Sequence, residues 1–290
     1  MTDRSRAREL AAHFSGEDPI WDAFALVLDT DRYLNMGYAP RYLPYPLVDS
    51  QTRLATYLGR ELTRALGYSA GARLLDVGCG RGGPTVTLAR EFGFDVTGVE
   101  LVAHNARLAR EAVAEAGVAA DVCRGDVRRL PVRTDSVAAC VGVDAAEYVP
   151  EKDRLFGELQ RVTGPGGTVA VSDLAITAEA ASDPEATAAV ERFADAWGLA
   201  VPTTESSFRA AAEDAGLASI ELTDITAHSV GRFGVWVALF QALDGAVPGA
   251  TADALLSRAG VDLDAVRETV AATRPALGYL RHVALTAGVE

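Results

Sequence analysis

Cysteine and histidine are scarce in this sequence, and their placement argues against disulfides and metal binding. The 290 residues contain 3 cysteines, an odd number without Cys-x-x-Cys spacing, so neither a disulfide framework nor a zinc site is expected. The 4 histidines are scattered, and none stands beside a carboxylate or a cysteine at the spacing of metal ligands. We therefore expect no metal cofactor, and surface or packing roles for His13, His104, His228 and His282.

Positive charge is also scarce, since Lys152 is the only lysine and arginine supplies every other strong cation. The formal net charge is −13 and the sequence pI is ≈ 4.8. A surface of this sign repels nucleic-acid phosphates and anionic membranes, so no nucleic-acid partner is expected. No apolar run approaches the length of a membrane span, and residues 1–10 are charged and unlike a signal peptide. These features predict a cytoplasmic protein without stable membrane insertion.

A glycine-rich turn follows an expected strand and precedes an expected helix. The apolar segment Arg73–Val77 is typical of a short buried strand, and an amphipathic pattern follows the turn. Gly78, Gly80 and Gly83 satisfy G-x-G-x-x-G, which binds nucleotides because glycine allows positive φ and close approach of a ligand to the backbone. The next apolar segment ends on Glu100, where a carboxylate can accept the hydroxyl hydrogens of a ribose.

Asp76, just before this turn, separates two classes of nucleotide cofactor. The turn of a dinucleotide-dependent dehydrogenase receives a pyrophosphate, which a neighbouring carboxylate would repel. S-adenosylmethionine has no phosphate, and its sulfonium and ammonium groups attract acidic residues. Asp76 therefore favours S-adenosylmethionine, with capping of the following turn as an alternative role.

The motifs resemble those of class I S-adenosylmethionine-dependent methyltransferases that act on small molecules. Leu74–Gly80 looks like their first motif and Glu100 like their ribose-binding acid. Gly125–Val127 looks like the loop that reads adenine, with Asp126 near the exocyclic amine, and Val162–Thr168 is similar to the turn before their fifth strand. The resemblance, which includes natural-product sugar O-methyltransferases and tocopherol and quinone C-methyltransferases, runs in order from about residue 33 to the C-terminus.

This resemblance implies S-adenosylmethionine as the cofactor. It also implies a set of cofactor-binding residues, most of them in the motifs above: Asp76, Gly78, Cys79, Gly80, Gly83, Glu100, Leu101, Asp126, Val127, Asp144 and Tyr38. Asp144 is expected to bound the methionine end of the cofactor.

Expected strands and helices alternate along most of the chain, which predicts an α/β fold with a doubly wound, mostly parallel sheet and right-handed crossovers. The resemblance implies the seven-stranded Rossmann-like methyltransferase sheet, in which the last strand inserts antiparallel. Strands are expected near Arg73–Val77, Asp95–Val99, Asp121–Cys123, Ser136–Val141, Thr168–Ser172, Ala218–Asp224 and Arg281–Ala287. Helices are expected near Pro84–Phe92, Ala103–Ala116, Lys152–Val162 and Ser206–Ala215.

The sequence divides into three regions of one structural domain: an N-terminal helical arm or lid (1–70), a cofactor-binding core (71–175), and the rest of the sheet with helical caps (176–290). In the arm, the expected helices Ala7–Leu28 and Leu47–Leu66 flank a segment rich in aromatic residues and proline, Tyr33–Pro46. Aromatic residues this dense in an aromatic-poor chain predict a lid over a ligand, with ordinary packing of the arm as the alternative.

Two stretches interrupt the alternation, Ala175–Pro202 and Val230–Pro275. Both fall where ligand crevices form in open α/β sheets, and we interpret them as helical caps that shape a substrate pocket. A homodimer interface is the competing explanation for the apolar face of Phe233–Leu243.

The loop Gly142–Pro150, after the fourth expected strand, opens onto the point where an acceptor would meet the cofactor. Relatives often place one or two histidines just before the proline of this loop, whereas this chain has Glu147 and Tyr148. Glu147 could act as a base only if desolvated, and Tyr148 is expected to orient the substrate. Asp173 matches an acid that some relatives use near the substrate, or else caps the next turn. Glu147, Tyr148 and Asp173 are the candidate catalytic residues.

These observations predict a methyltransferase that moves a methyl group from S-adenosylmethionine to an O, C or N atom of a small, partly apolar molecule. The tyrosine-rich arm also allows a cationic amine as the acceptor, because tyrosine faces attract cations. The missing histidines leave open a catalytically silent protein that binds S-adenosylmethionine. A dehydrogenase is the third alternative, which Asp76 disfavours.

Overall fold

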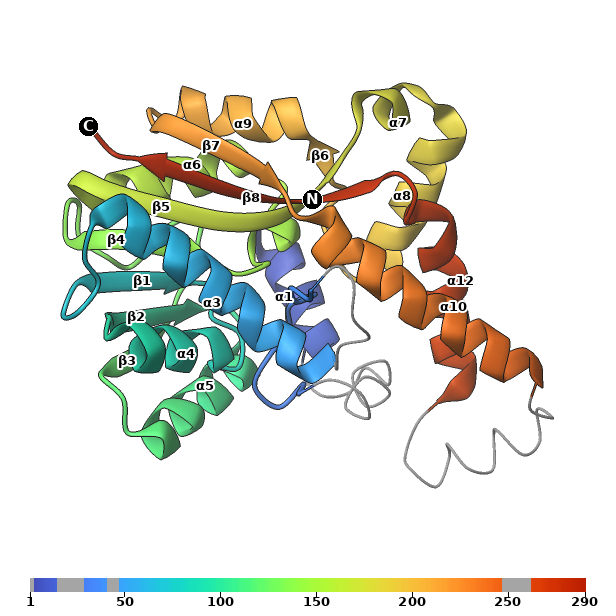
Figure 1. The fold of residues 1–290 in the computed structure, drawn as a ribbon, viewed down its shortest axis with the longest axis horizontal. Helices are drawn as coiled ribbons and strands as arrows, with labels where there is room; N and C mark the ends of the chain where they lie inside the picture. Colours follow the sequence, from blue (N-terminus) through green and yellow to red (C-terminus); the bar gives the residue numbers. More distant parts are fainter. Residues whose placement is uncertain (1–2, 15–28, 41–46, 247–261) are drawn as a thin grey trace.

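The computed structural model describes residues 3–14, 29–40, 47–246 and 262–290, which form one mixed β-sheet between layers of helices (Figure 1). The strands are β1 (Arg73–Val77), β2 (Asp95–Glu100), β3 (Ala120–Arg124), β4 (Val137–Gly142), β5 (Thr163–Ile176), β6 (Thr203–Thr204), β7 (Ala218–Asp224) and β8 (Leu280–Gly288). The helices before β5 are α1 (Asp3–Phe14), α3 (Leu47–Leu66), α4 (Gly83–Phe92), α5 (Ala103–Ala116), the 3-10 turn η1 (Ala146–Tyr148) and α6 (Lys152–Val162). Those after it are α7 (Ala178–Ser182), α8 (Pro184–Ala196), α9 (Glu205–Asp214), the 3-10 turn η2 (Thr226–His228), α10 (Val230–Ala246) and α12 (Leu263–Ala276).

The strand order is β3-β2-β1-β4-β5-β8-β7, with β8 antiparallel to both of its neighbours and the other pairs parallel. This order confirms the expected doubly wound sheet with an antiparallel last strand. The sheet has one strand more than expected, because the two-residue strand β6 pairs with the end of β5. Two residues are too few to leave a periodic signal in the sequence.

Strand β5 is longer than the sequence indicates, spanning Thr163–Ile176 rather than Thr168–Ser172. Its pairing with β4 shifts register, since Val137 lies opposite Thr163 whereas Ala139 lies opposite Thr168. The glycine-rich turn expected before this strand is thus a bulge within it, which a sequence pattern cannot distinguish from a loop.

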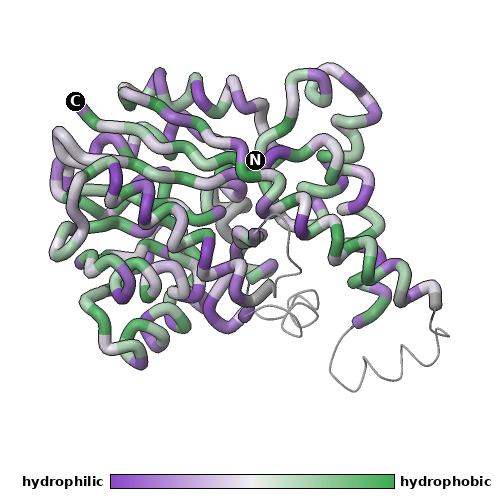
Figure 2. The backbone as a smooth tube through the Cα atoms, in the orientation of Figure 1, coloured by the Kyte–Doolittle hydropathy of each residue, from purple (hydrophilic) through white to green (hydrophobic). Residues whose placement is uncertain are grey.

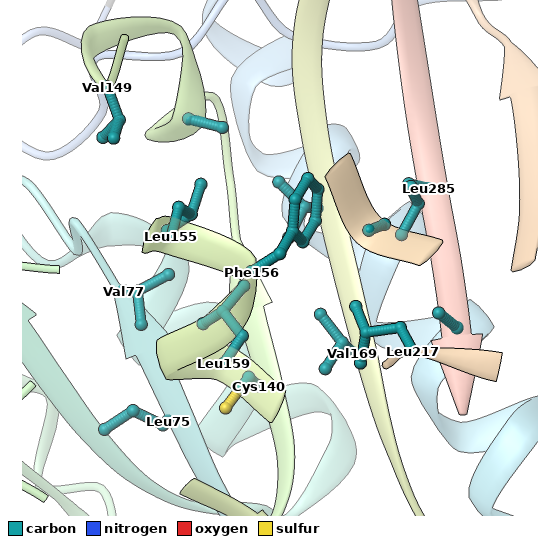
Figure 3. Close-up of a cluster of buried hydrophobic side chains, with 14 of the residues drawn as sticks. Leu75, Val77, Cys140, Val149, Leu155, Phe156, Leu159, Val169, Leu217 and Leu285 are labelled. Atoms are coloured by element: carbon teal, nitrogen blue, oxygen red, sulfur yellow. The ribbon is translucent and has the colours of Figure 1, made fainter. Parts of the chain in front are cut away.

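Alternating side chains of the strands feed two hydrophobic cores. Leu75 on β1 and Val169 on β5 pack with Phe156 of α6 on the side covered by α6 and α9 (Figure 3). Their neighbours Leu74 and Ala170 belong to the core beneath α3 and α4 on the other side. Because both faces are buried, the central strands are predominantly hydrophobic along their length, as the green tube in Figure 2 shows.

Helices α8, α10 and α12 form a lobe at one end of the sheet (Figure 1), and α12 leads into β8. Within the lobe α12 packs along α8, and Trp197 Nε1 at the end of α8 donates a hydrogen bond to Thr273 Oγ1 at 2.8 Å. None of the described helices is long and apolar enough to cross a membrane.

Some expectations fall outside the described residues. They are the later part of the expected helix Ala7–Leu28 (15–28), the aromatic and proline residues of 41–46, and the stretch 247–261 within the second expected cap.

Candidate active site

A cavity opens at the carboxyl ends of β1 to β4, where the strand order reverses beside β1. Open α/β sheets bind ligands at this kind of crevice. The cavity spans about 900 Å³, part of it open to solvent, which falls within the range of small-molecule sites. Its walls are the glycine turn after β1, the loops after β2, β3 and β4, residues of the N-terminal arm, and α1.

The glycines of the turn are required for two different reasons. Gly78 and Gly80 have φ of +66° and +56°, in the left-handed region that favours glycine, and a Cβ on Gly78 would lie 2.5 Å from Cβ of Ala145. Gly83 lies outside the cavity wall, and a Cβ there would lie 2.5 Å from the carbonyl oxygen of Arg32. The third glycine of the motif thus makes room for the arm.

Glu100, at the end of β2, presents its carboxylate to the cavity. Its two oxygens accept hydrogen bonds from the backbone N–H groups of Gly80 (3.0 Å) and Val102 (2.7 Å). Burial raises the pKa of Glu100 to about 7. Asp76 is fully buried behind the turn, outside the cavity wall, where Thr85 Oγ1 lies 2.5 Å from one carboxylate oxygen. Burial raises the pKa of Asp76 to about 7 as well.

Asp126, after β3, lies in the cavity wall beside Arg128. Arg128 donates hydrogen bonds to both carboxylate oxygens, from its backbone N–H (2.9 Å) and from its guanidinium (2.8 Å and 3.1 Å). Burial alone would raise the pKa of Asp126, but these bonds and the positive charge lower it overall. Asp126 is therefore a fixed carboxylate that keeps lone pairs for a further donor.

Asp144, after β4, connects the cavity wall to the arm and to two further strands. Its carboxylate accepts hydrogen bonds from the backbone N–H of Met36 (2.8 Å), from Ser172 Oγ, and from His282 Nε2 (2.9 Å). Asp144 has a φ of +54°, a conformation that is unfavourable for residues other than glycine and that asparagine and aspartate tolerate best.

The arm contributes Leu34 and Asn35 to the cavity wall, rather than Tyr38. Tyr38 stacks between Tyr57 and His228, with ring centroids 5.0 Å and 4.5 Å away. Residues of the arm thus line the cavity, and the direction of its backbone decides which of its side chains enter it.

Tyr148 is the candidate catalytic residue that lines the cavity, with its ring 5.3 Å from that of Phe14 in α1. Glu147 and Asp173 are buried outside the cavity wall, near Lys152, whose Nζ lies 2.5 Å from Asp173 Oδ2. Burial, followed by the charges of Asp144 and Asp173, raises the pKa of Glu147 well above its usual range.

The structure brings most of the predicted site residues together around one cavity: Gly78, Cys79, Gly80, Glu100, Leu101, Asp126, Val127, Asp144 and Tyr148. Those that it places elsewhere are Asp76, Gly83, Tyr38, Glu147 and Asp173. Leu34 and Asn35 also line the cavity, from the aromatic segment of the arm that the sequence placed over a ligand. Lining residues that the sequence did not single out include Leu10, Phe14 and Asn105. The described residues contain no group of three His, Cys, Asp or Glu side chains that could hold a metal ion.

The cavity suits a ligand with a nucleoside and an amino-acid end. Glu100 can accept ribose hydroxyl hydrogens at one wall. Asn35 Oδ1 is a buried acceptor without a hydrogen-bond partner among the described residues, and Asn35 lines the same cavity. Such an acceptor can receive a hydrogen from an ammonium group. The residues present therefore fit S-adenosylmethionine.

The fold and the cavity define a Rossmann-like nucleoside-binding enzyme core. Residues 74–167 match the family described as a methyltransferase domain. Methyltransferase GfsG of Streptomyces halstedii is 31% identical over 188 residues, which cover 64% of this chain and 67% of that protein. Sterol 4-C-methyltransferase strm-1 of Caenorhabditis elegans is 29% identical over 213 residues, 72% of this chain and 62% of that protein. The chain belongs to the class I S-adenosylmethionine-dependent methyltransferases.

Solved structures share the whole fold. Geranyl diphosphate C-methyltransferase from Streptomyces coelicolor A3(2), in complex with Mg²⁺, geranyl diphosphate and S-adenosyl-L-homocysteine, has a TM-score of 0.70 at 19% identity and covers 98% of each chain. A geranyl diphosphate methyltransferase in complex with GPP and sinefungin has a TM-score of 0.75 at 18% identity. These comparisons confirm the expected fold class and, with the family, S-adenosylmethionine as the cofactor.

Proposed function

We propose that the protein transfers the methyl group of S-adenosylmethionine to an O, C or N atom of a small, partly apolar molecule bound beside Tyr148. One observation carries this proposal: Tyr148 and Phe14 line the same cavity as Glu100 and the glycine turn. A molecule that contacts Tyr148 therefore shares one continuous space with the cofactor.

The proposal of a partly apolar acceptor rests on the apolar side chains in the cavity wall. Leu10 and Phe14 of α1 and Val149 of the loop after β4 contribute apolar side chains there. Leu10 and Phe14 share a hydrophobic cluster with Val266 of α12 and Phe240 of α10, so these two helices support this part of the wall. None of the described residues of α7 to α12 lines the cavity directly.

The names of relatives support an apolar acceptor. They include the sterol methyltransferase described above and a 2-methyl-6-phytyl-1,4-hydroquinone methyltransferase from Synechocystis, 35% identical over 103 residues. Both named acceptors combine a hydroxyl or ring carbon with a large hydrocarbon part. The match to the second protein covers 36% of this chain and 32% of that protein, so it supports the acceptor class and not the particular acceptor.

When bound, S-adenosylmethionine supplies a methyl group already activated by its sulfonium. The protein has to hold the acceptor in line with that group, and alignment alone can contribute about 7–11 kcal/mol. Glu100 and Asp126 fix the nucleoside end of the cofactor. The unpaired Asn35 Oδ1 can accept a hydrogen bond from its ammonium group. Tyr148 orients the acceptor molecule, while Phe14 packs against its ring and excludes water.

Glu147 and Asp173 support this arrangement from behind the cavity wall. Glu147 is 5% exposed, and burial raises its pKa well above the ordinary value of a glutamate. Asp173 is paired with Lys152. We therefore assign Tyr148 to contact with the acceptor. Glu147 and Asp173 belong to the buried group of side chains around Lys152 that holds the Tyr148 loop in place.

The test is a methyl-transfer assay on prenylated hydroquinones, phenols, sterols and small amines, with S-adenosylhomocysteine and the methylated product measured by mass spectrometry. Tyr148→Phe should lower kcat for the best acceptor by about tenfold or more, with an unchanged Kd for S-adenosylmethionine. Methylation that is unaffected in Tyr148→Phe would remove this residue from the acceptor site. Tight cofactor binding without transfer to any acceptor would favour a catalytically silent binder.

A further inference from the structure

The arm is held over the cavity by its backbone. Leu34 and Asn35 line the cavity, and the residue that follows them, Met36, donates its N–H to Asp144 Oδ2 at 2.8 Å. Gln51 of α3 holds the same segment: its carbonyl oxygen accepts from Asn35 Nδ2 at 3.2 Å, and its Nε2 donates to the carbonyl oxygens of Tyr33 and Asn35 at 3.3 Å and 3.1 Å. The position of the two lining side chains therefore depends on two anchors, Gln51 and the Asp144 carboxylate.

That carboxylate is fixed by groups from two strands that lie beyond β4. Ser172 of β5 accepts a hydrogen bond from the backbone N–H of Asp144 at 2.9 Å, and its hydroxyl donates back to Asp144 Oδ1. His282 of β8 donates from Nε2 to the same Oδ1 at 2.9 Å. Burial alone would raise the pKa of Asp144, but His282, and then Ser172 and Met36, lower it overall, so the carboxylate stays ionised.

His282 is itself placed rigidly. It is 0% exposed, its backbone N–H donates to Thr226 Oγ1 at 2.9 Å, and its carbonyl oxygen accepts from the N–H of Ile225 at 2.8 Å. Its second ring nitrogen, Nδ1, is buried and has no hydrogen-bond partner among the described residues. The hydrogen bond of this buried ring is therefore the one from Nε2 to Asp144. Burying an imidazole with one nitrogen unsatisfied costs folding free energy, and the bond to the charged Asp144 offsets part of that cost.

We propose that His282 is a positioning residue for the cofactor site. By fixing Asp144 Oδ1, it aims Oδ2 at the N–H of Met36 and keeps Leu34 and Asn35 at the cavity wall. His282 does not line the cavity, so its effect reaches the cofactor through Asp144, which does, and through the arm. The inference rests on the cofactor site described above, and it gives a function to a histidine that lies 138 residues from its partner in the sequence.

The test compares His282→Gln with His282→Asn, measuring the Kd for S-adenosylmethionine by calorimetry and kcat at saturating cofactor. A glutamine amide reaches the place of Nε2 and can donate to Asp144, whereas an asparagine amide reaches only the place of Nδ1. Loss of a hydrogen bond to a buried charged group predicts about tenfold or more weaker cofactor binding for His282→Asn. His282→Gln should bind within about threefold of the parent, and kcat at saturation should change less than Kd in both variants.

A double-mutant cycle with Asp144→Asn tests whether the effect passes through Asp144. The His282→Asn substitution should cost little further affinity in that background, because the carboxylate that it positions is gone. Equal loss in His282→Gln and His282→Asn would show a packing role and overturn the proposal. So would cofactor binding at parental affinity in both variants.

If His282→Asn does not fold, amide hydrogen exchange in the parent and in His282→Gln still decides. The Met36 amide should be strongly protected in both, and exchange as fast as in an unstructured peptide would overturn the proposal. Failure of the parent protein to bind S-adenosylmethionine at all would instead contradict the cofactor assignment, so the two failures are distinguishable.

Discussion

Lys152, the only lysine of the chain, is buried in an ion pair with Asp173, with Nζ 2.5 Å from Oδ2. The same Nζ donates to the carbonyl oxygen of Ala146 at 2.6 Å, at the start of the turn that carries Tyr148. The side chains are 7% and 1% exposed. The pair thus ties the start of α6 to β5 and to the loop that forms the acceptor wall.

Lys152→Met should destabilise the protein by about 3–5 kcal/mol at pH 7, because it leaves the Asp173 carboxylate buried without a counter-charge. The loss should shrink as the pH falls and Asp173 becomes protonated. Urea unfolding measures it, and Lys152→Met/Asp173→Leu is the matched control, since an apolar pair leaves no uncompensated charge. A double variant no more stable than Lys152→Met would contradict this account.

Cofactor affinity should depend on pH through Glu100. Its pKa in the free protein is about 7, and the neutral acid cannot accept the hydrogens of two ribose hydroxyls. Below pH 7 binding must therefore be accompanied by loss of a proton from Glu100. This raises the Kd for S-adenosylmethionine by up to about tenfold per pH unit. Calorimetry between pH 5.5 and 8.5 should show this fall for the parent and weak, pH-independent binding for Glu100→Gln. Equal parental affinity at pH 6 and pH 8 would exclude Glu100 as the titrating group.

Asp76→Asn should stabilise the protein above pH 7 and not below pH 4. The folded-state pKa of about 7 exceeds the ordinary value of 3.8, so the folded protein resists ionisation of this buried carboxyl. Below the ordinary pKa the carboxyl is neutral in the folded and the unfolded state, and the protein keeps its full stability. As the pH rises through 7, the free energy of unfolding falls by up to about 4 kcal/mol. An amide of the same size avoids that loss while still accepting from Thr85. Unfolding of both proteins across pH 4–8 checks it; a stability difference that is constant with pH would refute the prediction.

Gly83→Ala should lower stability by about 1–3 kcal/mol and weaken cofactor binding, because the added Cβ would lie 2.5 Å from the carbonyl oxygen of Arg32 and displace the arm. Gly157→Ala is the control: this glycine lies within α6 with no atom within 4 Å of an added Cβ. It should gain about 0.5–1 kcal/mol with unchanged cofactor binding. Thermal unfolding and calorimetry measure both, and equal effects of the two substitutions would show that the close approach of the arm is unimportant.

The sequence predicts those parts of the site that belong to one continuous motif. Gly78, Gly80 and Glu100 depend on a strand, a turn and the next strand, so their placement follows from local pattern. The doubly wound sheet was predictable from the alternation of strands and helices, because βαβ crossovers have a fixed hand. The antiparallel last strand was expected from the resemblance alone, and the two-residue β6 and the bulge in β5 left no periodic signal.

Contacts between distant segments were not predictable. His282 and Asp144 meet because β8 inserts beside β5, which no spacing in the sequence reveals. Tyr38 was expected at the cofactor, yet the arm turns it toward Tyr57 and places Asn35 at the cavity. The single lysine was visible in the sequence, but its burial against Asp173 depends on packing between α6 and β5.

The most direct test of the central claim is calorimetric titration of the purified protein with S-adenosylmethionine and, separately, with a nicotinamide dinucleotide. The account predicts one S-adenosylmethionine bound per chain, at least about tenfold weaker binding in Glu100→Gln at pH 8, and no binding of the dinucleotide. Tight binding of the dinucleotide alone, or S-adenosylmethionine binding that is indifferent to Glu100→Gln, would contradict it.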